Sequence, residues 1–463
     1  MDPSKFRVII VGGSVAGLVL AHCLHRAGID HVVLEKGKNV APELGASIGI
    51  MPNGARVLEQ LGFQEEIERD TEPMTISQIT FPDGLALESQ YPQVIHERFG
   101  FPLVFLRRAK FLKIAYESYP EKTKILTNKR VTGVKRYPDR LCAVTDDGSL
   151  YEGSIIVGAD GVHSRIRSEM WRTADEDTPG SIPGEEKNGM TVEYACVFGI
   201  SSGLKGLEAG EQVNAFLEKA AVMLMQAEGG RVFWFMFKKL DQKYVYPAVP
   251  RFSLDDAENL CREMKDVRFY KDLHVRDLWK TREIASMTVL EEGLFKTWMH
   301  DRIVLVGDSV HKMTPNFGQG ANSAIEDAAA LASLLHRLLR DNHSRHPSPV
   351  QIQDTLQKYQ SIRYPRVRHI YDLSWAVCRI HCGDGLLYRL LGRYYTPLNA
   401  NLPANIASKA FADGETLEFL PPPVRSGPGW TGYSRKAKSG SWSYAVILVL
   451  IALMVQGIVW YSG

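Results

Sequence analysis

The feature that most constrains this fold is a glycine-containing turn close to the start of the chain. Residues 6–36 run from an apolar, β-branched segment through "GGSVAG" into a helix-period segment and then into a second apolar run. This order of segments predicts a βαβ unit, and the two strands of such a unit are parallel. We therefore expect an α/β protein built on a parallel sheet.

The small residues of this turn stand where a nucleotide-binding turn needs them. Gly12 permits the tight turn, and Gly17 permits close packing of the helix on the strand. Ser14 replaces the middle glycine of G-x-G-x-x-G, but it is small enough to let the helix N-terminus approach a pyrophosphate. Glu35 follows about 20 residues later, where a carboxylate can accept hydrogen bonds from both hydroxyls of an adenosine ribose and repel a 2′-phosphate. The site therefore favours FAD or NAD over NADP, unless Glu35 is a strand-end charge paired with Lys36.

Two later segments show the same passage from strand to helix. In "VGADGVHSRIR", Asp160 stands at a strand end just before a helix. In "VLVGDSVHKMTPNFGQGANSAIEDA", Asp308 ends a strand and can accept a hydrogen bond from a ribityl hydroxyl. Gly320 and Ala321 then expose backbone N–H groups at a helix N-terminus, which attracts anionic oxygen. The order and spacing of the three motifs are more specific than any one of them.

The C-terminal run 444–461, "YAVILVLIALMVQGIVWY", is uncharged over 18 residues and bracketed by aromatic residues. Arg435, Lys436 and Lys438 precede it, so the positive-inside rule keeps the body of the protein on the cytosolic side. We predict a single membrane anchor, with the endoplasmic reticulum as the expected location. A buried terminal helix, or one lying flat on a membrane, is the alternative.

The organisation of the remaining chain follows from changes in pattern. Between about 190 and 250, apolar runs joined by glycine-rich turns predict an antiparallel sheet inserted into the nucleotide-binding domain. The predicted segments are the FAD-binding domain in two parts, 1–175 and 286–372, a mainly substrate-binding sheet domain, 176–285, a C-terminal region, 373–425, a linker, 426–443, and the anchor.

Composition excludes some partners. The formal net charge is +2 over 463 residues, so no overall attraction to nucleic acid is expected. The six cysteines are scattered, and we expect them to be reduced. Cys378 and Cys382 have no companion pair at ligand spacing, and we predict no metal site.

Together, the turn with Glu35, the G-A-D-G-x-x-S-x-x-R segment and the G-D-x-x-H-x-x-x-P segment resemble the class A flavoprotein monooxygenases related to p-hydroxybenzoate hydroxylase, over about residues 6 to 372. "GASIGIMPNGARVLEQLG", "ERFGFPLVFLRR" and "GVHSRIRSEMW" are more closely similar to the fungal FAD-dependent monooxygenases of indole-diterpene (paxilline-type) and meroterpenoid pathways, which epoxidise a prenyl chain. That subgroup shares the serine at position 14.

The resemblance implies noncovalent FAD, with NADPH as a transient cosubstrate. It places Gly49 close to the flavin ring and Asp308 and Ala321 near the ribityl chain and ring. It also brings Arg108 to the phosphate and ribityl region, although the neighbouring Arg107 is an alternative and either arginine can be solvated on a first helical turn.

The reaction implied by the resemblance is epoxidation by a flavin C4a-hydroperoxide. The substrate would be a meroterpenoid or indole-diterpene intermediate, whose prenyl alkene is prepared for cyclisation by a membrane-bound terpene cyclase. No catalytic side chain is predicted, because the cofactor carries the chemistry. His311 is expected to be structural. Five aromatic residues either line a slot for the prenyl tail or pack the sheet core: Phe216, Phe233, Trp234, Phe235 and Phe237.

Two other functions fit the same motifs. An aromatic hydroxylase of this fold would need a polar pocket and a base to activate a phenol. A noncatalytic prenyl-binding escort, similar to the GDP-dissociation inhibitors, would carry no working flavin, and the purified protein would be colourless.

Overall fold

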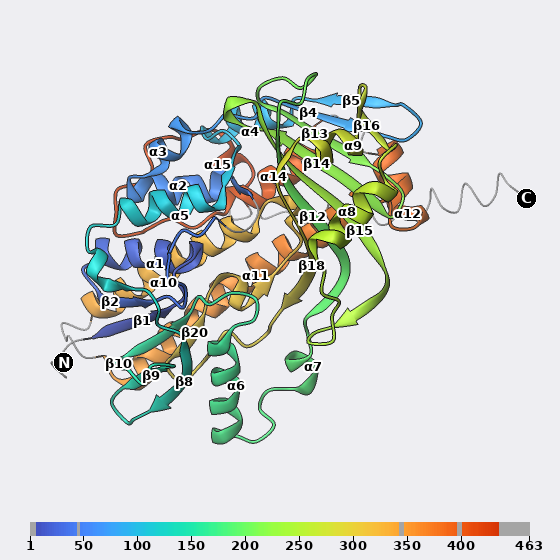
Figure 1. Ribbon diagram of the computed structural model, residues 1–463. Coiled ribbons are helices and arrows are strands. Elements are labelled where there is room, and N and C mark those ends of the chain that lie inside the picture. Colours follow the sequence, from blue (N-terminus) through green and yellow to red (C-terminus); the bar gives the residue numbers. More distant parts are fainter. Residues whose placement is uncertain (1–5, 44–46, 342–346, 396–400, 435–463) are drawn as a thin grey trace, which may run out of the picture.

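The structure is a computed structural model, and it describes residues 6–43, 47–341, 347–395 and 401–434. Two large sheets occupy different halves of the molecule, with the long helix α11 between them in the view of Figure 1. The predicted α/β class and the inserted sheet are both present.

The first sheet is the parallel sheet that the opening segment predicts. Strand β1 lies in its interior and pairs in parallel with β11 on one side and β2 on the other. In spatial order its strands are β19 (Met299–His300), β20 (Ile303–Leu305), β11 (Ile155–Gly158), β1 (Arg7–Val11), β2 (Asp30–Leu34) and β7 (Ile125–Leu126). Only β19 runs antiparallel to its neighbour in this sheet.

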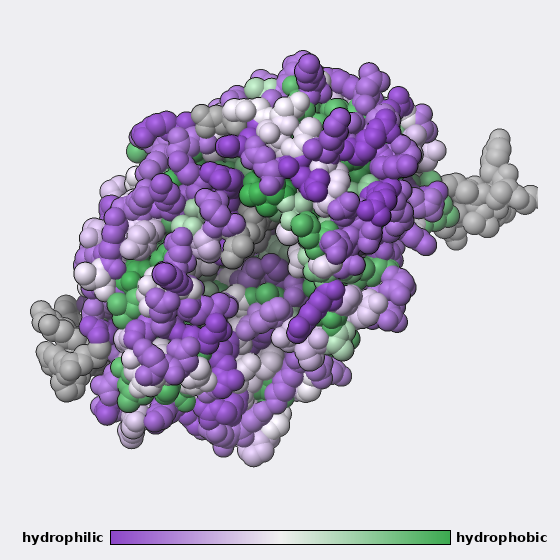
Figure 2. Space-filling view, in the orientation of Figure 1, coloured by the Kyte–Doolittle hydropathy of each residue, from purple (hydrophilic) through white to green (hydrophobic). Residues whose placement is uncertain are grey.

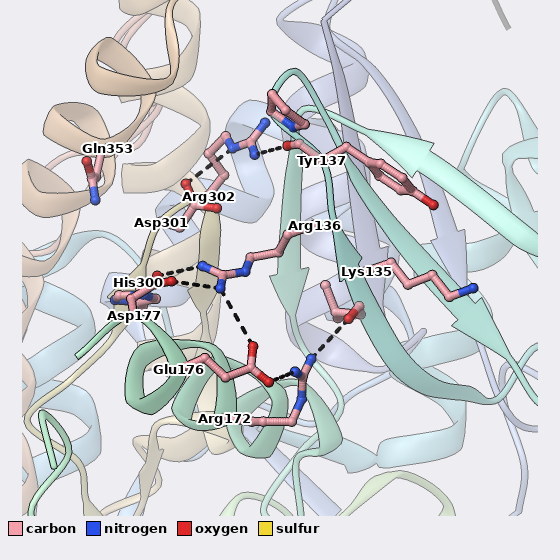
Figure 3. A pocket seen from close by; sticks show the side chains of 12 residues that line it. Lys135, Arg136, Tyr137, Arg172, Glu176, Asp177, His300, Asp301, Arg302 and Gln353 are labelled. Atoms are coloured by element: carbon pink, nitrogen blue, oxygen red, sulfur yellow. Dashed lines mark hydrogen bonds and ion pairs between the residues drawn. The ribbon is translucent and has the colours of Figure 1, made fainter. Parts of the chain in front are cut away.

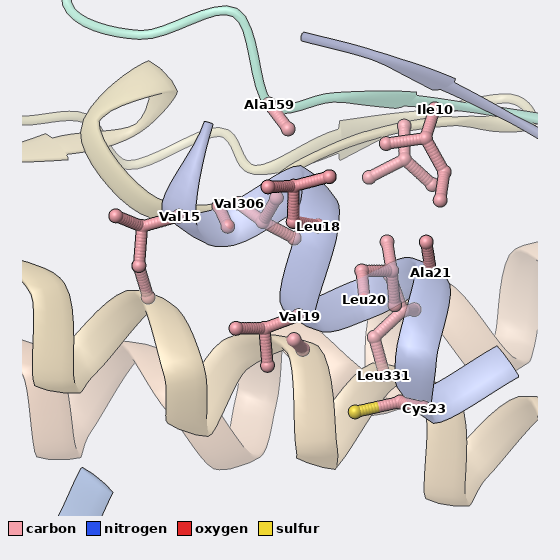
Figure 4. Packing of buried hydrophobic residues seen from close by; sticks show 14 of the residues in the cluster. Ile10, Val15, Leu18, Val19, Leu20, Ala21, Cys23, Ala159, Val306 and Leu331 are labelled. Atoms are coloured by element: carbon pink, nitrogen blue, oxygen red, sulfur yellow. The ribbon is translucent and has the colours of Figure 1, made fainter. Parts of the chain in front are cut away.

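Helix α1 (Val15–Arg26) connects β1 to β2 and completes the predicted βαβ unit. It is apolar on two faces because it lies between the sheet and α10 (Gly320–Asp341). Figure 4 shows Leu18 toward Ala159 and Val306 on the sheet side, while Val19 points toward α10. Helix α1 begins directly after β1, whereas η3, β21 and η4 lie between the end of β20 and the start of α10.

The second sheet has eight strands and is antiparallel except where β13 meets β4. In spatial order its strands are β21 (His311–Lys312), β18 (Arg282–Leu294), β12 (Thr191–Ser202), β15 (Arg231–Val245), β14 (Ala220–Gln226), β13 (Glu211–Phe216), β4 (Ile76–Thr80) and β5 (Ala86–Ser89).

This pairing corrects three predicted boundaries. The β4–β5 hairpin lies within the predicted FAD-binding segment 1–175 but belongs to the second sheet. Strand β18 crosses the boundary at 285, and α11 (Pro349–His381) crosses the one at 372. Strand pairing between distant segments decides membership of a sheet, and sequence patterns within one segment do not report it.

Smaller elements complete the fold. The remaining strands are β3 (Ser47–Ile50), β6 (Val104–Arg107), β8 (Val131–Arg136), β9 (Leu141–Thr145), β10 (Leu150–Gly153), β16 (Arg268–Tyr270) and β17 (Leu273–His274). The remaining helices are α2 (Pro52–Leu61), α3 (Gln64–Arg69), α4 (Tyr91–Phe99), α5 (Arg108–Glu117), α6 (Arg165–Asp177), α7 (Gly184–Lys187), α8 (Leu254–Glu263), α9 (Val275–Lys280), α12 (Leu386–Leu390), α14 (Leu402–Ala412) and α15 (Gly429–Gly432). The short helical segments are η1 (Lys122–Lys124), η2 (Glu228–Gly230), η3 (Gly307–Ser309), η4 (Pro315–Phe317) and η5 (Leu391–Tyr395).

The start of the predicted linker belongs to the packed body. Arg425 Nε lies 2.6 Å from Glu59 Oε1 on α2. Trp430 Nε1 donates to the carbonyl oxygen of Phe99 at 3.0 Å, and the two rings lie 4.8 Å apart, edge to face. The predicted boundary at 426 is therefore too early, since residues 427–434 lie against α4 and α14.

The structure gives no support for the predicted anchor. Within the described ranges, every helix is too short or too polar to span a bilayer. The run 444–461 and linker residues 435–443 lie outside those ranges.

Candidate cofactor and substrate site

A cavity of about 670 Å³ lies where the edge of the parallel sheet faces the second sheet. Figure 2 shows the surface hollowed between the two halves of the molecule. Nine of the ten predicted cofactor residues line the cavity: Gly12, Ser14, Glu35, Gly49, Arg108, Asp160, Asp308, Gly320 and Ala321. The three motifs, far apart in sequence, therefore meet at one site.

The turn after β1 leaves no room for side chains. Gly12 has a φ of +106°, and a Cβ atom there would lie 2.3 Å from the carbonyl oxygen of Ala159. A Cβ atom on Gly17 would lie 1.9 Å from the carbonyl oxygen of Gly12. Gly17 thus lets α1 pack onto the turn, and the helix N-terminus comes to the cavity wall.

Glu35 is held at the end of β2 by backbone N–H groups. Its Oε2 accepts from Gly13 N and its Oε1 accepts from Gly37 N, both at 2.6 Å. It forms no ion pair with Lys36, which was the alternative interpretation. Each carboxylate oxygen keeps a further lone pair, so a ribose hydroxyl can still bind there.

Arg108, rather than Arg107, faces the cavity. Arg108 begins α5, and its Nη2 donates to Ser14 Oγ at 2.8 Å. Arg107 points to Glu43, with Nη1 and Oε2 3.3 Å apart, and is half-buried. Burial lowers the pKa of Arg108, and the carboxylates of Asp308 and Glu35 offset this only in part. A partly desolvated guanidinium next to a helix N-terminus suits a phosphate.

Asp308 lies in η3 and pairs with a residue that sequence reasoning missed. Lys312 Nζ lies 2.6 Å from Asp308 Oδ2, and both residues line the cavity. Burial lowers the pKa of Lys312, but the carboxylates of Asp308 and Glu291 together raise it by more, so the amine stays charged. The only sequence signal for this lysine is its position four residues after the aspartate.

The carboxylate of Asp160 binds the start of the helix that follows it. Its Oδ2 accepts from Arg165 N at 2.6 Å and from Ile166 N at 3.1 Å, while Oδ1 accepts from Ser164 Oγ at 2.5 Å. These N–H groups open α6 and have no intrahelical partners. The side chain therefore caps a helix, and Asp160 borders the cavity without turning its carboxylate to a ligand.

Gly49 on β3 passes between two apolar side chains. A Cβ atom there would lie 2.8 Å from the Phe105 ring and 2.9 Å from Met51 Cε. Asn322, which was not predicted, fixes this strand: its Nδ2 donates to the carbonyl oxygens of Gly49 at 2.9 Å and Gly318 at 2.7 Å. The buried amide thus joins β3 to the loop that precedes α10.

His311 is structural, as expected. It is fully buried, and its Nε2 lies 2.6 Å from Asp327 Oδ2. The same oxygen accepts from Gly307 N at 2.9 Å. Asp327 therefore fixes both flanks of the segment that carries Asp308.

The five predicted aromatic residues divide between different environments. Phe233, Phe235 and Phe237 share one face of β15, and only Phe235 lines the cavity. Trp234 faces the opposite side, where its Nε1 donates to Ser201 Oγ at 2.9 Å. Its candidate role in a substrate slot is therefore wrong, because alternate residues of a strand point to opposite faces.

The apolar wall of the cavity comes from the second sheet and from the two-stranded sheet of β3 and β6. Met223 on β14 stands directly opposite Phe235 in the strand register. Both line the cavity, together with Phe105 on β6. The wall that the second sheet contributes is thus a methionine and an aromatic ring.

A second hollow, of about 760 Å³, lies between β8, which is an edge strand of the three-stranded sheet of β8, β9 and β10, and helix α6. Figure 3 shows Arg136, Asp177, Glu176 and Arg172 turned toward one another, while Lys135 points away from them. Arg136 Nη1 lies 2.5 Å from Asp177 Oδ2, which His300 Nε2 also approaches at 2.8 Å. Because most of its charged side chains form ion pairs with one another, this hollow is a weaker candidate site.

The first cavity fits a dinucleotide with a flavin. The turn at Gly12 and the start of α10 can accept a pyrophosphate, and Arg108 and Lys312 add positive charge. Glu35 would then hold the ribose. This arrangement defines an FAD-binding flavoprotein of α/β class with an inserted sheet.

Comparisons with known proteins agree. A family model described as an FAD binding domain matches residues 5–182 and 203–374. The chain is 50% identical to the FAD-dependent monooxygenase nvfK of Aspergillus novofumigatus, covering 98% of this chain and 97% of that one. It is 48% identical to the FAD-dependent monooxygenase paxM of Penicillium paxilli, covering 97% and 94%. The chain therefore belongs to the FAD-dependent monooxygenases of this FAD-binding family, and FAD is its cofactor.

Solved structures show the same fold. Klebsiella pneumoniae HpxO in complex with FAD and uric acid has a TM-score of 0.70 at 23% identity, covering 87% of this chain and 96% of that one. A salicylate hydroxylase substrate complex has a TM-score of 0.66 at 18% identity, covering 88% and 98%.

Proposed function

We propose that this FAD-dependent monooxygenase uses NADPH and O2 to epoxidise an alkene in the prenyl chain of a meroterpenoid or indole-diterpene intermediate. The observation that carries the proposal is the apolar wall of Phe105, Met223 and Phe235 across the cavity from the nucleotide-binding turn. When bound, FAD supplies the oxygen-transfer chemistry. The protein itself has to hold the cofactor, orient the apolar prenyl chain of the substrate and exclude water.

The wall suits an alkene better than a phenol. An electron-rich alkene needs no deprotonation, whereas a phenol must be activated by a base. Met223 and Phe235, which the second sheet turns to the cavity, carry no titratable group. Both side chains can pack along a branched hydrocarbon, and methionine adapts to irregular apolar shapes. The aromatic hydroxylase remains the second candidate function.

A prenyl-binding escort is a weaker candidate. Such a protein has no need for the glycine-containing turn, the fixed carboxylate of Glu35 and the Arg108 guanidinium at one cavity. Their convergence favours an enzyme that retains its flavin, and a purified protein with bound flavin would be yellow.

Location and partners form a separate part of the proposal, and they rest on the sequence alone. A prenylated substrate partitions into a membrane, so attachment through 444–461 at the endoplasmic reticulum would raise its local concentration. A membrane-bound terpene cyclase would then receive the epoxide.

The test is a product assay with the purified holoenzyme, NADPH, ¹⁸O2 and a prenylated indole. The expected product carries one ¹⁸O atom in the prenyl chain, and acid converts it to a diol. An ¹⁸O atom on the aromatic ring would instead show a hydroxylase. Prenyl binding without any flavin absorbance would show an escort.

A further inference from the structure

The short helix η4 carries a buried amide with unused hydrogen-bonding capacity. Its first residue, Pro315, lines the cavity, and so does Gly318 directly after it. Asn316 lies between them and is 8% exposed. Its Oδ1 is buried and accepts no hydrogen bond from any part of the chain that the structure describes. Buried polar atoms are nearly always paired, so an unpaired one beside a cavity points to a missing ligand atom.

The amide nitrogen of Asn316 meets a histidine from a distant segment. Its Nδ2 lies 3.4 Å from Nδ1 of His381, in the last turn of α11. An amide nitrogen can only donate, so His381 Nδ1 accepts and its proton lies on Nε2. Within the described ranges, that Nε2–H takes part in no hydrogen bond or ion pair. The pair therefore leaves one acceptor, Asn316 Oδ1, and one donor, His381 Nε2–H.

The surroundings of the pair are apolar and uncharged. The ring of His381 lies 4.7 Å from that of Phe216, at the end of β13. Cys378, one turn before His381 on α11, and Cys382, directly after it, belong to the same apolar cluster as Phe235. Burial alone lowers the pKa of His381 to about 4, so the imidazole is neutral at pH 7. A neutral donor and acceptor in such a setting suit an uncharged ligand group rather than a carboxylate or a phosphate.

The pair is fixed relative to the cavity. Thr314, which lines the cavity, donates through Oγ1 to the carbonyl oxygen of Ser374 at 3.0 Å. This bond joins the start of η4 to α11 two turns before His381. The cofactor-side loop and the helix beside the second sheet thus hold the amide and the imidazole in one place.

We propose that Asn316 and His381 form a polar anchor that binds a hydroxyl group of an otherwise apolar substrate. A hydroxyl donates one hydrogen bond and accepts another, which matches the free acceptor and the free donor. Asn316 and His381 lie beside the cavity rather than in its lining, and a hydroxyl bound there would fix which part of a flexible substrate lies near the flavin. The inference rests on the proposed function only for the prenyl nature of the apolar part.

The test measures binding to the full-length holoenzyme through changes in flavin absorbance. The probes are a long-chain prenyl alcohol and the hydrocarbon of the same chain without the hydroxyl group. For Asn316→Leu, the Kd of the alcohol should rise about tenfold or more, because one partner of a buried hydrogen bond is lost. The Kd of the hydrocarbon should stay the same. Asn405→Leu is the matched control, since Asn405 bonds to Tyr433 away from the cavity, and it should change neither value.

A second variant guards against loss of the fold. His381→Phe keeps a ring against Phe216 but removes the donor, and it should weaken the alcohol alone. If Asn316→Leu loses its flavin, the His381→Phe variant decides the outcome. The proposal is overturned if the wild-type enzyme fails to prefer the alcohol, or if His381→Phe leaves that preference intact. Because the titration needs no turnover, it is independent of whether epoxidation is the reaction.

Discussion

Arg108 Nη2 donates to Ser14 Oγ at 2.8 Å, so the residue that departs from the glycine fingerprint holds a cation at the N-terminus of α1. A glycine at this position would allow the same approach of a pyrophosphate but could not bind the guanidinium. The serine is therefore compatible with the dinucleotide site and adds a contact to it.

Arg108→Ala should weaken FAD binding by roughly tenfold or more, because a charged hydrogen-bonding group contributes about 1.5 to 3 kcal/mol. Arg107→Ala is the matched control: the neighbouring arginine pairs with Glu43 outside the cavity. FAD affinity of both variants can be measured by fluorescence recovery on dilution. Equal effects of the two substitutions would remove Arg108 from the cofactor site.

Glu35→Ala should also weaken FAD, by about 1.5 to 3 kcal/mol, through the loss of charge-assisted bonds to the ribose. Glu35→Gln keeps the size of the side chain and one oxygen, so its effect should be smaller. The same carboxylate also holds Gly13 and Gly37, so its loss could disturb the turn. Circular dichroism of both variants is therefore the control for the fold. Unchanged flavin affinity in the alanine variant would contradict the ribose assignment.

Asp308→Ala should lose flavin or turnover while keeping its secondary structure. The carboxylate lies at the cavity and compensates the charge of Lys312, so its removal leaves an unpaired ammonium at the flavin site. Asp83→Ala, which breaks an exposed pair with Arg393, should leave flavin content unchanged. Flavin absorbance and circular dichroism of the purified variants measure flavin content and secondary structure. Normal flavin content and normal epoxidation by Asp308→Ala would show that Asp308 has no role in the cofactor site.

Truncation should separate the packed part of the C-terminal segment from the rest. A chain that ends at Ser434 keeps Trp430 on Phe99 and under the guanidinium of Arg56, 3.9 Å from the ring centroid. A chain that ends at Ser426 loses these contacts, and its free energy of unfolding should fall by about 2 kcal/mol or more. Thermal unfolding with bound FAD measures the difference. Equal melting temperatures would restore the earlier linker boundary at 426.

The sequence alone determined the features that depend on local geometry. The βαβ unit around Gly12 and Gly17 and the carboxylate of Glu35 follow from periodicity and from glycines at fixed spacing. The strand before Asp308 was also indicated, although β20 ends at Leu305 and Asp308 lies in η3. A tight turn and a helix N-terminus are built by consecutive residues, and the same few residues suffice to indicate them. The class of cofactor was therefore predictable before any tertiary contact was known.

Only the tertiary structure decided which side chains reach the cavity. It placed Arg108 and Phe235 at the cavity, but not their neighbours Arg107 and Trp234. It also showed that the carboxylate of Asp160 caps a helix. Neighbouring residues differ little in sequence pattern, but their side chains leave the backbone in different directions. It also brought Asn316 to His381, 65 residues later in the chain. Such a pair depends on how α11 packs against η4 and the second sheet, and long-range packing of this kind leaves no periodic signal in the sequence.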